Sequence, residues 1–261
     1  MKGCRVFVPI LAYHKVSNKF EWGINTVSIR SFEAQIKYLF KNTYYSISLE
    51  QYRNGKLQVN STRHPVIITF DDADESVYHH AFPILKAYGY SATLFIISDF
   101  VGKYNTWDAN VGGIYSRHLN WEQILELSNN GWEIGSHTAT HRDLLGLSLR
   151  ETKEELQSSK EIIADKIGKP IQFISYPFNR FNHHIILLAR QAGYTGGCAL
   201  SVKKQLNSAP KEFNIQRHGV YNIDSLFWFK QKLTNAKVEQ IKQRIISLAA
   251  IGTILYKRYR N

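Results

Sequence analysis

Residues 66–72 read VIITFDD, a run of apolar and β-branched residues that ends in two adjacent aspartates. Such a run predicts a strand buried on both faces, as the strands of parallel sheets are. Functional sites of α/β folds lie at the carboxyl ends of their strands, so Asp71 and Asp72 are candidates for chemistry. Taken alone, however, an Asp-Asp pair is more often a surface turn.

Short apolar runs and amphipathic stretches alternate around this strand. We expect further strands at Val6–Tyr13, Ala92–Ile97, Trp132–Gly135, Ile171–Ser175 and Tyr194–Leu200. We expect helices at Phe32–Phe40 with Ser31 as the cap, Ala81–Tyr88 with Pro83 in the first turn, Trp121–Ser128, Ser148–Ile167 and His183–Ala192. Strands that alternate with helices predict parallel pairing and an α/β fold.

Length and composition favour one large domain. The 261 residues are 44% hydrophobic and 21% charged, which fits a globular chain with a sizeable core. With two cysteines the chain has neither a disulfide scaffold nor a Cys-rich zinc site. No apolar run is long enough to span a membrane and the N-terminus lacks a signal-peptide pattern, so we expect a cytoplasmic or membrane-peripheral protein.

The positive charge is concentrated near the C-terminus. The net charge is +12, and residues 202–261 hold twelve Lys/Arg against three Asp/Glu. This predicts either an anionic partner or simply a basic surface; no nucleic-acid-binding motif is present, so we expect no nucleic acid partner. Residues 245–256 are mostly apolar and precede a basic end, which suits a core helix or an anchor on an anionic membrane. We therefore separate a domain at 1–240 from a basic, partly apolar tail at 241–261.

A second motif, SHTATH at residues 136–141, follows the short strand expected at 132–135. Histidines four residues apart can share one face and one metal ion; the alternative is one buried and one exposed histidine without metal. Because both motifs follow strands, we expect them to meet. Two histidines and one aspartate form a three-ligand site with open positions, as catalytic metals require, and the other aspartate can act as a base.

The residues in this combination resemble the polysaccharide deacetylases with a NodB-type domain, carbohydrate esterase family 4. The first motif is similar at 69–72 (TFDD), with the helix and strand after it at 81–86 and 89–96; the second is similar at 136–141 and the third at 175–179 (SYPFN). The opening PILAYHKV at 9–16 resembles the branch that acts on poly-β-1,6-N-acetylglucosamine. The resemblance covers roughly residues 8–230.

This resemblance implies a distorted (β/α)7-type barrel and metal-dependent removal of acetyl groups from N-acetylhexosamine units of a poly- or oligosaccharide. Carried over by position, it implies Asp71 as the base, His14 as the general acid, and the backbone N–H of Phe178 as an oxyanion donor, with Tyr176 lining the cleft. It implies metal ligands at Asp72, His137 and His141. Zinc suits this donor set, and cobalt, nickel or manganese also fit it.

The chain departs from the family pattern at three positions. Ala73 and Asn179 replace glycines, and Ser175 replaces an arginine that orients the base. The late Leu-x-His motif is not evident; His218 is an alternative acid, but a structural position near the last strand is the favoured interpretation for it. The departure at Ser175 leaves open a catalytically impaired, glycan-binding relative.

Substrate recognition is the least constrained part of the prediction. Aromatic faces suit sugar rings, so Trp22, Trp107 and Trp121 are candidate stacking residues, with core packing as the alternative for each. The same chemistry on another acyl group, such as deformylation of a lipid-linked amino sugar, is the remaining alternative.

Overall fold

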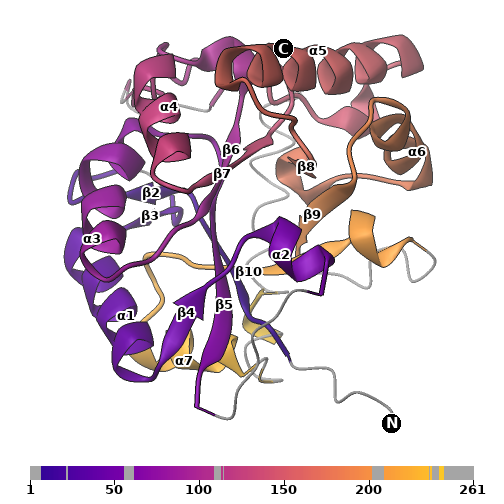
Figure 1. Ribbon diagram of the computed structural model, residues 1–261. Helices are drawn as coiled ribbons and strands as arrows, with labels where there is room; N and C mark the ends of the chain where they lie inside the picture. Colours follow the sequence, from indigo (N-terminus) through magenta and orange to yellow (C-terminus); the bar gives the residue numbers. More distant parts are fainter. Residues whose placement is uncertain are drawn as a thin grey trace, which may run out of the picture.

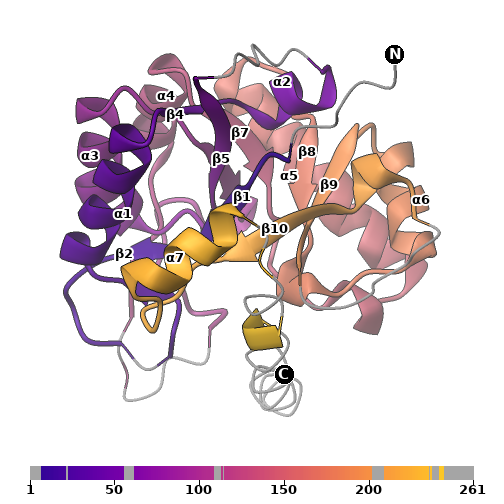
Figure 2. The ribbon, with the colours of Figure 1, turned by 90° about the horizontal axis from the view of Figure 1, so that it is seen from below.

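The computed structural model describes residues 7–21, 23–55, 62–108, 113, 115–201, 209–234, 236 and 241–243. Strands and helices alternate along the chain, as Figures 1 and 2 show from two directions. The strands are β1 (Ile10–Tyr13), β2 (Lys15–Val16), β3 (Thr26–Val27), β4 (Tyr44–Ser46), β5 (His64–Phe70), β6 (Thr93–Ile96), β7 (Glu133–Ser136), β8 (Phe173–Ser175), β9 (Gly196–Leu200) and β10 (Ile215–Gly219). The α-helices are α1 (Ile29–Lys41), α2 (Leu49–Arg53), α3 (Phe82–Ala87), α4 (Trp121–Asn129), α5 (Leu149–Ile167), α6 (His183–Gln191) and α7 (Leu226–Leu233).

Seven of the strands close into a barrel in which every pairing is parallel. Their order is β1-β10-β9-β8-β7-β6-β5, and β5 pairs with β1 to complete the ring. The strand β5 is shared, because its first three residues pair with β4 and its last four with β1. The predicted α/β fold, a distorted (β/α)7-type barrel, is confirmed.

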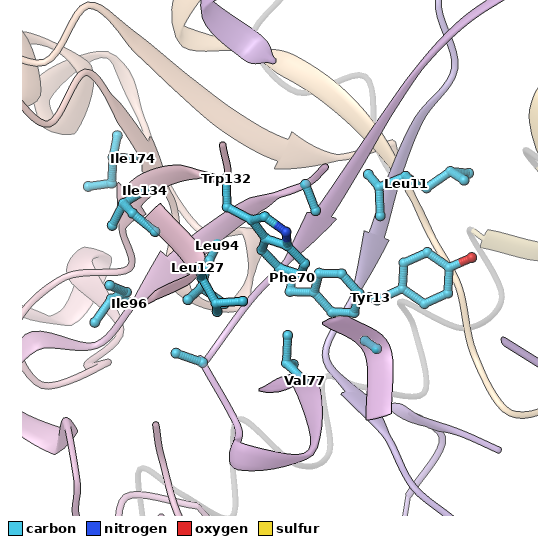
Figure 3. Packing of buried hydrophobic residues seen from close by; sticks show 14 of the residues in the cluster. Leu11, Tyr13, Phe70, Val77, Leu94, Ile96, Leu127, Trp132, Ile134 and Ile174 are labelled. Carbon is cyan, nitrogen blue, oxygen red and sulfur yellow. The ribbon is translucent and has the colours of Figure 1, made fainter. Parts of the chain in front are cut away.

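Helices cover the outside of the barrel and bury its outward-facing side chains. In Figure 1, α1, α3 and α4 lie on one side of the strands and α5 and α6 on the other; α7 contacts α1. Figure 3 shows the apolar layer between strands and helices, where the ring of Phe70 stacks on Tyr13 at 5.5 Å and on Trp132 at 5.7 Å between centroids. Each buried side chain of this size stabilises the fold by about 1.5–3 kcal/mol.

The barrel interior around Gly135 and Gly196 is filled by side chains. A Cβ at Gly135 would lie 2.6 Å from the ring of Phe95, and one at Gly196 would lie 2.6 Å from the ring of Phe173. These two glycines therefore make room for phenyl rings that fill the barrel.

The helix ends follow the expected capping chemistry, with one correction. The predicted cap Ser31 is wrong: Ser28 caps α1, and its hydroxyl accepts the N–H of Ser31 at 3.1 Å. Two serines three residues apart can both be N-caps, and the earlier one starts the helix. The predictions for α5, with Ser148 at its start and Gly168 in the left-handed conformation after it, are confirmed.

The predicted C-terminal unit at 241–261 lies outside the described residues except for 241–243. There, Nε2 of Gln243 donates to the carbonyl of Gly219 at 2.9 Å, which ties the start of this unit to the end of β10. In the parts of the chain that the structure covers, no helix combines the length and the apolar character needed to cross a membrane. The membrane contact expected from residues 245–256 stays a prediction.

Candidate active site

The candidate residues lie at the carboxyl ends of the barrel strands. His14 is four residues after Ile10 and Asp71 is four residues after Ile67, and both isoleucines face the barrel interior. Side chains an even number of residues apart share one face of a strand, so His14 and Asp71 face inward too. The backbone N–H of Asp71 donates to the carbonyl of Tyr13 at 2.9 Å, which places His14 beside Asp71.

The carboxylate of Asp71 is held by the guanidinium of Arg217 on β10. Nη1 donates to Oδ1 at 2.8 Å and Nη2 donates to Oδ2 at 2.7 Å, and both residues are buried. Burial acts to raise the pKa of Asp71, but the charge of Arg217, together with His137 and His14, outweighs burial and lowers the pKa below its ordinary value. Asp71 is therefore ionised at neutral pH and points in a fixed direction.

Arg217 orients Asp71 in place of the arginine that Ser175 replaces. The resemblance implies an arginine at position 175, but here the hydroxyl of Ser175 accepts from Nη2 of Arg217 at 2.7 Å and donates to Oδ2 of Asp71 at 3.2 Å. The orienting guanidinium thus reaches Asp71 from the last strand of the barrel instead of from the third motif.

Asp72, His137 and His141 each direct one ligand atom to a common point. Oδ1 of Asp72 lies 3.3 Å from Nε2 of His137 and 3.5 Å from Nε2 of His141, and all three ligand atoms lie within 4.8 Å of one another. All three side chains are nearly buried, and Oδ1 has no well-formed hydrogen bond among the described residues. Ligands of a tetrahedral zinc ion have about this spacing, so the donor set fits a divalent cation.

The surroundings of His137 favour a cation as well. Its Nδ1 lies 2.8 Å from the carbonyl of Ser175, which can only accept, so Nδ1 carries the hydrogen and Nε2 keeps its lone pair for a metal. Burial acts to lower the pKa of His137, but the carboxylates of Asp72 and Asp71 outweigh burial and raise it. The same negative field attracts a divalent ion.

Backbone strain is concentrated in the three loops that form this site. Seven described residues other than glycine have a positive φ, and six of them lie in these loops: Asp72, Ala73, Thr138, His141, Phe178 and Asn179. At Asp72 the φ of 69° reverses the chain after β5, so the side chain turns back toward the site instead of facing away as strand alternation requires. Strained conformations persist where the surrounding structure holds them in place, and they cluster at functional sites.

Two of these strained residues explain departures from the family pattern. Ala73 and Asn179 occupy positions where the family has glycine, and each has a φ of 56°. Asn tolerates this conformation, and its side chain is bonded to β9, with Oδ1 accepting from the N–H of Leu200 at 2.8 Å. The replacements therefore keep the backbone conformation that glycine would supply.

His118 and Trp107 contact the candidate metal ligands from the outside. Nδ1 of His118 lies 2.6 Å from the carbonyl of Asp72, and Nε1 of Trp107 donates to Nε2 of His118 at 2.9 Å. Burial lowers the pKa of His118, so it is neutral, with its hydrogen on Nδ1. The indole of Trp107 also lies against the ring of His141, 4.0 Å between centroids.

Phe178 and Tyr176, the two residues predicted for oxyanion or substrate contacts, lie in different surroundings. Phe178 lies at the site, with its ring 4.7 Å from that of His141, and its role as an oxyanion donor stays a prediction. Tyr176 lies in the core instead: its hydroxyl donates to the carbonyl of Phe213 at 3.3 Å and its ring stacks on Phe181. We therefore assign Tyr176 to packing and not to the substrate cleft.

His218 does not join the site. It follows the inward-facing Arg217 on β10, so it faces outward, where its ring meets Phe7. Burial, and then the charge of Lys232, lower the pKa of His218 to about 4, so its imidazole is neutral at neutral pH. The structure therefore favours His14 over His218 as the candidate acid, and this role of His14 stays a prediction.

Of the candidate stacking tryptophans, Trp107 alone is placed at the site among the described residues. Trp121 begins α4 and packs against the core, and Trp22 lies outside the described residues.

Sequence reasoning missed Arg217, His118 and Glu155, which support the site without belonging to a motif. Glu155 on α5 is buried and bonds the loop that carries both histidines. For Arg217 a signal did exist, because a charged residue in an otherwise inward-facing position of a barrel strand needs a buried partner. His118 and Glu155 carry no comparable signal.

Comparison with known proteins agrees with this geometry. The family model described as polysaccharide deacetylase matches residues 58–197. YxkH of Bacillus subtilis, which is named for the same family, is 31% identical over 196 residues, 73% of this chain and 63% of that protein. A poly-beta-1,6-N-acetyl-D-glucosamine N-deacetylase of Staphylococcus aureus is 28% identical over 190 residues, 68% of this chain and 62% of that protein. The chain thus spans less than two thirds of these relatives.

Solved structures share the fold. The deacetylase PplD of Streptococcus pyogenes, solved with acetate, has a TM-score of 0.73 at 24% identity and covers 87% of this chain and 97% of its own. IcaB of Ammonifex degensii has a TM-score of 0.70 at 22% identity and covers 89% and 97%. Together with the family match, these findings show that the chain belongs to the polysaccharide deacetylase family.

Proposed function

We propose that this protein is a metal-dependent N-deacetylase that releases acetate from N-acetylhexosamine units of a poly- or oligosaccharide. The observation that carries the proposal is the convergence of Asp72, His137 and His141 beside an ionised, arginine-held Asp71 at the carboxyl end of the barrel. Asp72, His137 and His141 would hold a divalent ion, and such an ion would supply Lewis acidity and lower the pKa of a bound water.

Asp71 and His14 each carry out one of the two proton transfers that hydrolysis of the amide needs. Asp71 accepts a proton from the attacking water, because Arg217 keeps it ionised and aimed into the site. His14, inward-facing beside Asp71, donates a proton to the amine as acetate leaves. The N–H of Phe178, whose φ of 55° turns the backbone at the site, would stabilise the oxyanion.

Arg217 also bears on the alternative of a binding-only relative. That alternative rested on the absence of the family's arginine from position 175. Arg217 on β10 contacts Asp71 and Ser175 in its place. Each position that the proposed chemistry needs is filled by a suitable side chain.

For the substrate we propose a β-1,6-linked N-acetylglucosamine polymer. The support is the PILAYHKV segment, which supplies His14, and the relatives from Staphylococcus aureus that are named for this polymer. Trp107 lies against His141 and is only half-buried, so it is a candidate for contact with a sugar ring.

Acetate release from a panel of glycans tests this proposal. The panel contains β-1,6- and β-1,4-linked N-acetylglucosamine oligomers and their N-formyl counterparts, each with and without a chelator. We expect chelator-sensitive acetate release, fastest from the β-1,6-linked oligomers. Release of formate but not acetate would replace the proposal with a deformylase, and no release from any glycan would contradict it.

A further inference from the structure

The loop that carries both candidate histidine ligands is strained and needs support. Between His137 and His141 the backbone is left-handed at Thr138, with φ of 68°, and it is left-handed again at His141 itself, with φ of 61°. For residues with a side chain this conformation costs roughly 1–2 kcal/mol each. A contact from outside the loop must therefore hold it.

The carboxylate of Glu155, from the middle of α5, supplies that contact. Its Oε2 accepts two successive backbone N–H groups, from Ala139 and Thr140, each at 2.9 Å. Its Oε1 accepts from the hydroxyl of Thr140 and from Nε of Arg142 at 3.1 Å. Successive N–H groups that converge on one oxygen form an anion-binding nest, and here the anion is a side chain of the same chain.

The contacts of Glu155 lie next to His141 in the sequence. Ala139 and Thr140 lie between the two histidines, and Arg142 follows His141 directly. Glu155 therefore holds the backbone before His141 and the side chain of the residue after it, while being 3% exposed itself. Both oxygens of this buried carboxylate are engaged by hydrogen bonds from the loop and from Arg142.

We infer that Glu155 is a positioning residue, which sets the spacing of the Nε2 atoms of His137 and His141 and thereby the affinity of the site for a divalent ion. The inference rests on the proposed function, because that function places a metal at these histidines. Glu155 acts through the loop backbone and touches neither the metal ligands' side chains nor the reacting atoms.

Glu155→Gln is the direct test, and Glu151→Gln is its matched control. In Glu155→Gln the new side-chain amide would turn one NH₂ group toward N–H donors or toward Arg142, so the nest loses an acceptor. Glu151 lies on the same helix and bonds the same Arg142, at 3.2 Å, but it is only half-buried and its other printed bonds are to Ser148 at the start of α5. The glutamine side chain in Glu151→Gln can still serve the capping box of α5.

The readout is metal binding, measured on metal-stripped protein without substrate. Co²⁺ is titrated by its visible absorption and Zn²⁺ by competition with a chelating dye, next to the Tm of the metal-free protein. We expect Glu155→Gln to weaken metal binding by ~10–100-fold, the range for residues that orient metal ligands, and to change the Co²⁺ spectrum. Glu151→Gln should keep the affinity and spectrum of the parent.

A lowered Tm with parent-like metal affinity in Glu155→Gln would make Glu155 a purely structural residue and overturn the inference. If Glu155→Gln does not fold, Thr140→Val and Arg142→Met each remove one contact of the carboxylate, and parent-like affinity in both would also overturn it. A parent protein that binds no Co²⁺ would contradict the proposed function itself, and this inference with it.

Discussion

The guanidinium of Arg217 contacts both carboxylate oxygens of Asp71, at 2.8 and 2.7 Å, from a strand that β1 separates from the strand of Asp71. This pair joins the last strand of the barrel to the first motif. It fixes the direction of the base and its charge at the same time, because a planar guanidinium matches a carboxylate at two points.

Replacing Arg217 should separate these two effects. In Arg217→Lys the charge remains but the two-point contact is lost, so we expect turnover to fall ~10–100-fold with a small change in Tm. In Arg217→Met the buried carboxylate loses its partner, and we expect the free energy of unfolding to fall by about 3–5 kcal/mol. Urea unfolding and initial rates of acetate release check both.

The same variants make a prediction for pH dependence. The pKa of Asp71 is lowered in the parent, so the base stays ionised until the pH falls below its ordinary value near 3.8. Without Arg217 the pKa rises, and the acidic limb of kcat/KM should move to higher pH in Arg217→Met. A variant with the acidic limb of the parent would contradict the role of Arg217.

His14→Ala tests the assignment of the general acid. We expect turnover to fall ~10²–10⁴-fold, the range for loss of a proton donor, while the metal content stays that of the parent because His14 is not a ligand. Metal analysis and acetate release on the same samples check this. Unchanged turnover would assign the proton to a water molecule, since His218 faces away from the site.

Trp107→Phe tests the support behind Asp72. The variant keeps an aromatic ring but removes the N–H that His118 accepts, which leaves a buried nitrogen unpaired at a cost of about 1–3 kcal/mol. Urea unfolding measures the change, with Tyr104→Phe, an exposed aromatic residue of the same loop, as the control. Equal stability of the two variants would show that the Trp107–His118 bond contributes nothing.

His218 should make the protein sensitive to mild acid. Its pKa is about 4 in the folded protein and about 6.5 when unfolded, so between these values the unfolded state binds more protons. Stability is thus complete above pH 6.5 and falls as the pH decreases toward 4, by up to about 3 kcal/mol. In His218→Gln this part of the loss should disappear, whereas His79→Gln, at an exposed position, should behave as the parent. Urea midpoints at about pH 7, 6 and 5 decide between the two outcomes.

Local patterns in the sequence were sufficient to predict the α/β fold and the meeting of the two motifs, whereas the barrel and the choice of Asp72, His137 and His141 as candidate ligands came from the family resemblance. The run at 66–70 and its neighbours have the apolar patterns of buried parallel strands, and TFDD and SHTATH place their ligands just beyond two strand ends. The pairing of these motifs follows from the rule that parallel strands end on one side of a sheet.

What the sequence did not show depends on contacts between distant residues. Arg217 and Asp71 are 146 positions apart, and Glu155 supports a loop that precedes it by 13 to 16 positions from another element. The misplaced role of Tyr176 has a similar cause, because only the position of Phe213 shows that its hydroxyl is bonded inside the core. Such partners are chosen by the closed barrel, which no local pattern encodes.

The central claim is that a divalent ion held by Asp72, His137 and His141 is required for hydrolysis. The most direct measurement is acetate release from β-1,6-linked N-acetylglucosamine oligomers by parent protein and His137→Ala, each with its bound metal quantified. We predict one divalent ion per parent chain, activity that a chelator removes and added metal restores, and neither metal nor activity in His137→Ala. Acetate release at the parent rate from metal-free protein would contradict the account.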